Sequence, residues 1–131
     1  MATHKLKRPP LRYPIIPVYE ILKKTAQRLP EKLAAIDPRG GRELTFADLD
    51  QESDTLAGAF FSWGVEKGDR ISFFMENGWE YLVGFYATAK VGAVVSPMNP
   101  TFRERKVKHQ INDAESKILM VFRAIFRSSQ K

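Results

Sequence analysis

The sequence predicts an α/β fold, in which a mostly parallel sheet is flanked by helices and a β-hairpin stands apart. The main observation is the stretch 65–100, where a short apolar run, a helical pattern and a second apolar run follow one another. Two strands that are joined by a crossover helix run parallel to each other. A second observation is the Gly40-Gly41 pair between two short runs of strand-forming residues, which is typical of a hairpin loop.

The composition limits the class of protein. The chain has 131 residues, enough for one domain with its own core, and it contains no cysteine. The absence of cysteine excludes disulfides and thiolate chemistry and favours a reducing compartment, so we expect a cytoplasmic protein. The longest uncharged run, 91–102, contains two prolines and is too short to cross a membrane, so we expect no transmembrane segment.

The net charge of +6 is concentrated at the two ends of the chain. Residues 1–12 and 101–131 are basic, whereas the region between them is slightly acidic. A nucleic-acid-binding domain more often carries a basic face with interleaved aromatic residues. We therefore expect no nucleic-acid partner, and a basic nucleic-acid or membrane-surface binder is the alternative that rests on the charged ends alone.

The N-terminal part of the chain predicts an arm, a helix and the hairpin. Residues 1–14 are basic and rich in proline, so we expect a disordered basic arm. Apolar residues at helical spacing, with a proline at either end, predict a helix over 18–29. The two strands of the hairpin are expected at 33–37 and 43–46.

A second helix is expected to begin after Thr45, which would form a capping box with Asp48, and to end at Gly64. Its first half is acidic, as the helix dipole favours, and positions two apart point to opposite faces, so we expect a solvated face and no metal site. These acids are Asp48, Asp50, Glu52 and Asp54. The apolar residues expected to be buried are Phe46, Leu49, Leu56, Phe60 and Trp63.

The central unit begins with a strand at 70–75, which suits burial on both faces. Asn77 is expected to cap the following helix, and Gly92 is expected to end it in a left-handed conformation. A second strand is expected at 93–96, where Pro97 stops it.

The C-terminal part predicts one more helix and one more parallel strand. Thr101 is expected to cap the helix in a capping box with Glu104. His109 would lie on the exposed face of this helix, without a second ligand at a spacing that suits a metal. The strand is expected at 117–122, and 123–131 is expected to form an irregular tail.

The sequence contains none of the usual catalytic or phosphate-binding motifs. It has no P-loop, no dinucleotide-binding glycine pattern, no zinc-protease helix and no nucleophile elbow. The two histidines, His4 and His109, fall in the arm and on an exposed helix face. We therefore assign no catalytic, cofactor-binding or metal-binding residue.

Four segments in a fixed order nevertheless resemble one family. They are LTFADLD at 44–50, GVEKGDRIS at 64–72, MENGWEYLVGFYATAKVGAVVSPMNP at 75–100 and AESKILMV at 114–121. Together they resemble the N-terminal part of the AMP-dependent synthetase and ligase family, which includes the acyl-CoA synthetases. The resemblance covers residues 15–122 and implies one N-terminal α/β subdomain without an internal domain boundary.

The resemblance implies an ATP-dependent enzyme that joins a fatty or other carboxylic acid to AMP and then to coenzyme A. ATP, magnesium and coenzyme A are the cofactors implied for the full-length family. The family's phosphate loop, magnesium-binding glutamate and catalytic lysine follow the matched region and are not among these 131 residues. The leading hypothesis is therefore an N-terminal fragment, inactive alone, from a truncated, split or frameshifted gene.

A docking module is the main alternative. A parallel sheet of three or four strands would leave an open edge and uncovered apolar faces. The remainder of the ligase, encoded as a separate chain, could then be the partner that completes this chain.

Overall fold

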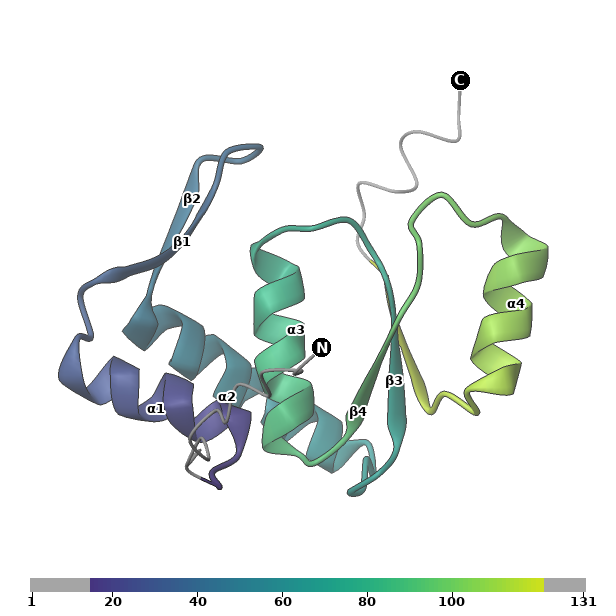
Figure 1. Ribbon diagram of the computed structural model, residues 1–131, viewed down its shortest axis with the longest axis horizontal. Coiled ribbons are helices and arrows are strands. Elements are labelled where there is room, and N and C mark those ends of the chain that lie inside the picture. Colours follow the sequence, from purple (N-terminus) through teal and green to yellow (C-terminus); the bar gives the residue numbers. More distant parts are fainter. Residues whose placement is uncertain (1–14, 122–131) are drawn as a thin grey trace, which may run out of the picture.

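A computed structural model describes residues 15–121 and has an α/β fold, as the sequence predicts (Figure 1). The expected arm over 1–14 and the expected tail over 123–131 lie outside the described residues. The elements in chain order are α1 (Val18–Arg28), β1 (Leu33–Asp37), β2 (Arg42–Thr45), α2 (Phe46–Ser62), β3 (Arg70–Phe74), α3 (Trp79–Lys90), β4 (Val94–Pro97), α4 (Glu104–Asp113) and β5 (Ile118–Val121).

The described strands form two separate sheets. β1 and β2 make the predicted antiparallel hairpin, in which Asp37 faces Arg42. The second sheet has the order β4-β3-β5 and is parallel throughout, with Ile71 of the central strand opposite Val95 on one side and Ile118 on the other. The predicted parallel strand–helix–strand unit is therefore confirmed, and so is the additional parallel strand.

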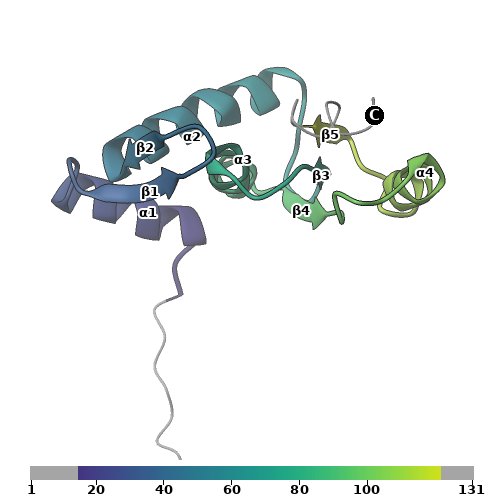
Figure 2. The ribbon, with the colours of Figure 1, turned by 90° about the horizontal axis from the view of Figure 1, so that it is seen from above.

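The helices lie on opposite faces of the parallel sheet. In Figure 2, α1, α2 and α3 are on one side and α4 is on the other. The strand order explains this arrangement, because the chain moves from β3 to β4 and then back past β3 to β5. Two right-handed crossovers in opposite directions place their helices on opposite faces.

The core lies between the parallel sheet and the face of α2 and α3. Ile71 and Phe73 of β3 are fully buried there, against Ala87 of α3 and Phe60 of α2. Gly84 allows α3 to approach closely, since a Cβ atom at this position would lie 3.0 Å from Met120 Cε and 3.1 Å from the Phe73 ring.

The opposite face of the sheet is less well covered. No residue of α4 is buried. Three apolar side chains of the edge strands are between 38% and 51% exposed, namely Val94 of β4 and Leu119 and Val121 of β5. Among residues 15–121, no helix is long and apolar enough to cross a membrane.

Several predicted helix ends are confirmed. The capping box of Thr45 and Asp48 is present at the start of α2, with the Asp48 N–H donating to Thr45 Oγ1 at 3.1 Å and the Thr45 N–H donating to Asp48 Oδ2 at 2.9 Å. Gly64 and Gly92 follow the ends of α2 and α3 with φ of 77° and 72°. This left-handed conformation favours glycine, so both glycines end their helices as expected.

Two predicted caps and one predicted core residue are wrong. α3 begins at Trp79 with Gly78 as its N-cap residue, so Asn77 lies too early to cap it. α4 begins at Glu104, and the Thr101 hydroxyl instead donates to Asn99 Oδ1 at 2.8 Å within the preceding turn. Trp63 is 63% exposed, because it follows the last turn of α2 and Phe60 already fills the core position before it.

Candidate functional site

One hollow of the described structure lies at the carboxyl edge of the parallel sheet. β3 and β4 end there side by side, since Phe73 pairs with Pro97. The loops that follow them enclose a groove of about 600 Å³. In open α/β sheets, ligands bind outside the carboxyl ends of the strands, where neighbouring connections leave in opposite directions. The groove occupies this position, and its lining residues are Met75, Glu76, Asn77, Tyr81, Pro97, Met98, Asn99 and Pro100.

The groove has an apolar floor and a polar rim. Met75 and Met98 are only 4% and 5% exposed, and the Met98 N–H donates to the Phe73 carbonyl at 2.9 Å. The ring of Tyr81 meets the ring of Phe73 edge to face, with 5.1 Å between their centroids. Apolar surface with a few polar groups suits an organic ligand. The side chains that line the groove do not pair a nucleophile with a base.

A cluster of charges lies behind one wall of the groove, where the hairpin meets the start of α3. The guanidinium of Arg39 bonds both carboxylate oxygens of Asp37, from Nε at 3.1 Å and from Nη2 at 2.8 Å. It also lies 3.6 Å from Glu76 and 3.7 Å from Glu80. Asp37 itself is 6% exposed.

The Arg39 contacts change the acidity of Asp37. Hydrogen bonds from the side chain and then from the backbone N–H of Arg39 lower the pKa of Asp37 from 3.8 to about 2, with a smaller contribution from the backbone N–H of Trp79. A carboxylate beside the first amides of a helix is stabilised by the helix dipole. Asp37 of the hairpin therefore lies beside the start of α3, where it lines the same small hollow as Gly78 and Trp79.

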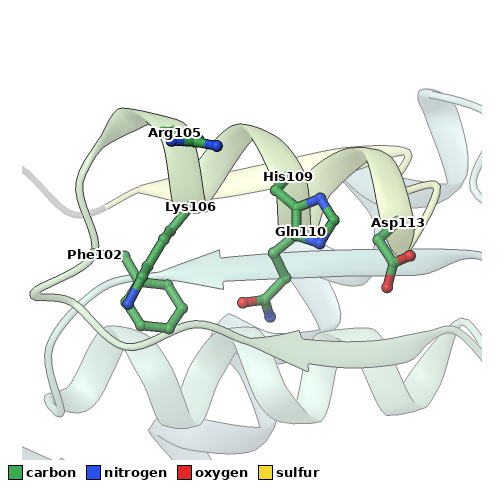
Figure 3. A pocket seen from close by; sticks show the side chains of 6 residues that line it. All are labelled: Phe102, Arg105, Lys106, His109, Gln110 and Asp113. Carbon is green, nitrogen blue, oxygen red and sulfur yellow. The ribbon is translucent and has the colours of Figure 1, made fainter.

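A second hollow, of about 660 Å³, runs along one side of α4 (Figure 3). Lys106 extends over the ring of Phe102, with Nζ 5.2 Å from the ring centroid. Gln110 donates to the Pro97 carbonyl at 2.8 Å. The exposed side chain of His109 lines this hollow, so the predicted exposure of His109 is confirmed. The lining residues are Phe102, Arg105, Lys106, His109, Gln110 and Asp113.

The acids of α2 have protein partners. Asp48 belongs to the capping box, and Glu52 pairs with Arg42. Asp50 and Asp54 both bind the ammonium of Lys90, each at 2.7 Å. The described part of the chain holds no group of three histidine, cysteine or acidic side chains that could bind a metal.

Sequence reasoning missed both charge clusters. The Arg39 cluster joins residues about forty positions apart, for which the sequence carries no local signal. The position of Lys90 in the last turn of α3 indicates a favourable contact with the helix dipole, but it does not indicate partners on α2. The spacing of Asp50 and Asp54, four positions apart on one helix face, was a usable signal for a shared partner.

Comparison with known families gives one match over most of the chain. A family model described as AMP-binding enzyme matches residues 22–131. This range includes all the described strands and the groove at their carboxyl edge.

Curated relatives are similar over most of this chain. The medium-chain fatty-acid–CoA ligase of Escherichia coli K12 is 34% identical over 94 residues, which are 72% of this chain and 16% of the relative. The human mitochondrial medium-chain acyl-CoA ligase ACSF2 is 32% identical over 113 residues, which are 86% of this chain and 18% of the relative. The chain therefore spans less than a fifth of the length of these relatives.

Solved structures have the same fold. The N-terminal domain of FACL13 from Mycobacterium tuberculosis matches with a TM-score of 0.79 and 25% identity, over 87% of this chain and 30% of that chain. The N-terminal subdomain of Klebsiella oxytoca NpsA, solved in complex with anthranilyl-AMSN, matches with a TM-score of 0.73 and 27% identity, over 79% of this chain and 27% of that chain.

Proposed function

Because the chain belongs to the AMP-binding enzyme family, we propose that it forms the N-terminal part of an ATP-dependent ligase that joins a carboxylic acid to coenzyme A. The match over residues 22–131 is the observation that carries the proposal. The place in the ligase is supported by the structural neighbours, which are themselves N-terminal domains or subdomains.

The proposed substrate class is a medium-chain fatty acid. Two relatives from distant organisms are named as medium-chain acyl-CoA ligases, and both are more than 30% identical to this chain. The groove at the carboxyl edge has the apolar floor that an acyl chain would require, formed by Met75 and Met98. A cytoplasmic location remains a prediction that rests on the absence of cysteine.

The 131 residues by themselves are proposed to be catalytically inactive. Phosphoryl chemistry requires preorganised donors and a metal around the phosphates. The acids of α2 do not fit a magnesium site, because each of them is engaged by a cap or by a cation. No catalytic step is therefore assigned to residues of this chain, and ATP, magnesium and coenzyme A would be held by other parts of the ligase.

Two experiments test the proposal. The purified chain, incubated with ATP, magnesium and a medium-chain fatty acid, should release no pyrophosphate, and release would contradict its inactivity. In a chimera, the chain would replace the matching segment of the Escherichia coli medium-chain ligase. The chimera should form acyl-CoA, whereas the same ligase without the segment should not. A folded but inactive chimera would contradict the proposed place in the ligase.

A non-catalytic docking module that completes a separately encoded ligase chain is a second candidate. It is favoured by the edge strands β4 and β5, which carry the exposed apolar residues Val94, Leu119 and Val121. Co-expression with the remaining part of a ligase domain, as a separate chain, tests it. Co-purification of the two chains is expected, and their separation during purification would eliminate this candidate.

A further inference from the structure

The loop between β3 and α3 lies between the groove at the carboxyl edge and a smaller hollow beside the hairpin. On one side, Glu76 and Asn77 line the groove at the carboxyl edge of the sheet. On the other side, Asn77 and Gly78 line a smaller hollow together with Arg39 and Asp37 of the hairpin. The position of this short loop therefore determines the shape of one wall of the groove.

Arg39 holds the loop from the side of the hairpin. Its guanidinium lies 3.6 Å from the Glu76 carboxylate, at the start of the loop, and 3.7 Å from the Glu80 carboxylate in the first turn of α3. The same guanidinium is fixed by its two bonds to Asp37. The planar fork of arginine can satisfy several carboxylates at once, which the single ammonium of lysine cannot do with the same geometry.

Gly78 provides the space for this contact. A Cβ atom at Gly78 would lie 1.9 Å from Arg39 Nη2 and 2.7 Å from Glu80 Oε2. The φ of Gly78 is −175°, an extended conformation that any residue adopts. A side chain at position 78 would therefore displace the ends of the Arg39 and Glu80 side chains, because the guanidinium packs directly on the loop.

We propose that Arg39 is a positioning residue of the ligase, which holds the loop 76–78 in place so that the loop forms one wall of the ligand groove. The inference rests on the proposed function for the identity of the ligand. The geometric part of the inference is that Arg39 holds the loop 76–78 in place. It concerns only residues of this chain and can be measured without catalytic activity.

Amide hydrogen exchange of the full 131-residue chain tests the geometric part. We expect Arg39→Ala to accelerate exchange at the Tyr81 amide, which donates to the Gly78 carbonyl at 3.2 Å, by about threefold to fivefold, because the loop loses its anchor. Gly78→Ala should have a similar effect, since the new methyl group displaces the guanidinium from the loop side. Combining the two substitutions should add little, because both remove the same contact.

Arg42→Ala is the matched control. Arg42 anchors the same hairpin, but through Trp79, with 3.8 Å from its guanidinium carbon to the ring centroid, and through Glu52. Exchange at the Tyr81 amide should change by less than about twofold in this variant. Equal acceleration in Arg39→Ala and Arg42→Ala would show that only the docking of the hairpin matters and would overturn the inference. Unchanged exchange in Arg39→Ala would also overturn it.

The chimera described above tests the functional part. Arg39→Ala should raise KM for the carboxylic acid by about fivefold and change kcat less, because a displaced groove wall weakens binding rather than chemistry. A fall in kcat at constant KM would contradict a role in shaping the groove. If the chimera with Arg39 intact is inactive, the proposed function fails, whereas the exchange experiment still decides whether Arg39 holds the loop.

Discussion

The ammonium of Lys90, near the end of α3, lies 2.7 Å from the Asp50 carboxylate of α2. It also donates to the Asp50 carbonyl at 2.9 Å, to Ser53 Oγ at 2.9 Å and to Asp54 Oδ1 at 2.7 Å. The Lys90 side chain is only 9% exposed. One cation thus joins α2 and α3, the two helices whose buried side chains form the core with β3.

Replacement of Lys90 by methionine should lower the free energy of unfolding by about 2–3 kcal/mol, because it leaves Asp50 without its partner in a largely buried setting. Urea denaturation monitored by circular dichroism measures this change. Lys24→Met is the matched control, since Lys24 forms an exposed pair with Glu20 at 3.7 Å and should cost less than about 0.5 kcal/mol. Equal losses in the two variants would contradict the importance of the Lys90 cluster.

The lowered pKa of Asp37 predicts a loss of stability in acid. The pKa of this carboxyl is about 2 in the folded chain and ordinarily 3.8. A depressed pKa stabilises the folded state above pH 4, and this contribution is lost as the pH falls from about 4 to about 2. Asp37→Asn should therefore flatten the dependence of the unfolding midpoint on pH in this range.

The flattening should be incomplete, because the pKa values of Asp48 and Asp69 are also lowered. Backbone and side-chain bonds from Thr45 lower the pKa of Asp48, and the Glu66 N–H and Lys117 lower the pKa of Asp69. Urea unfolding at several pH values between 2 and 5 gives the comparison. Identical pH profiles of the parent chain and Asp37→Asn would rule out the ion-paired state of Asp37.

The capping box of α2 predicts that Thr45 contributes more to the free energy of unfolding than Thr101 does. Thr45→Ala removes the bond that the Asp48 N–H donates, so it should lower the free energy of unfolding by about 1 kcal/mol. Thr101→Ala removes only a turn bond to Asn99, at a position ahead of α4, and should cost less than about 0.5 kcal/mol. Denaturant titration of both variants measures these changes. A larger loss of unfolding free energy in Thr101→Ala than in Thr45→Ala would support the sequence-based prediction that Thr101 caps a helix.

Replacement by alanine should change the stability of the chain in opposite directions at two glycines in helix interiors. At Gly58 of α2 a Cβ atom meets nothing within 4 Å, so Gly58→Ala should stabilise the chain by about 0.5–1 kcal/mol through helix propensity. At Gly84 the Cβ atom would press on Phe73 and Met120, which should cost about 1–3 kcal/mol and outweigh the same gain. Thermal unfolding of the two variants gives the comparison. Stabilisation by both substitutions would indicate that α3 can move away from the sheet.

The sequence predicted the elements that depend on neighbouring residues. The hairpin around Gly40-Gly41, the box at Thr45 and the parallel strands on either side of α3 follow from local patterns, and all are present. The helix starts expected after Asn77 and Thr101 were placed too early, since α3 and α4 begin after Gly78 and Arg103, and neither of these residues makes a side-chain cap bond. Neither position carries a local signal that would reveal this.

The candidate site was less accessible to prediction than the fold. The groove is assembled from two loops that meet only because β3 and β4 pair, so its lining follows from topology rather than from a motif. The contacts of Arg39 with Glu76 and Glu80 join segments that are far apart in the chain. Long-range ion pairs of this kind leave no periodic pattern in the sequence. The four-residue spacing of Asp50 and Asp54, in contrast, is a pattern that indicates a shared partner.

The central place of β3 in its sheet has a kinetic consequence. β3 pairs with β4 across one helix and with β5 only after a second helix has been made. Contacts between distant segments form slowly, because the entropy of loop closure must be overcome first. During synthesis, the hairpin and α2 can form early from neighbouring residues. β3 therefore has no strand partner until β4 is made, and it is an edge strand from then until β5 arrives.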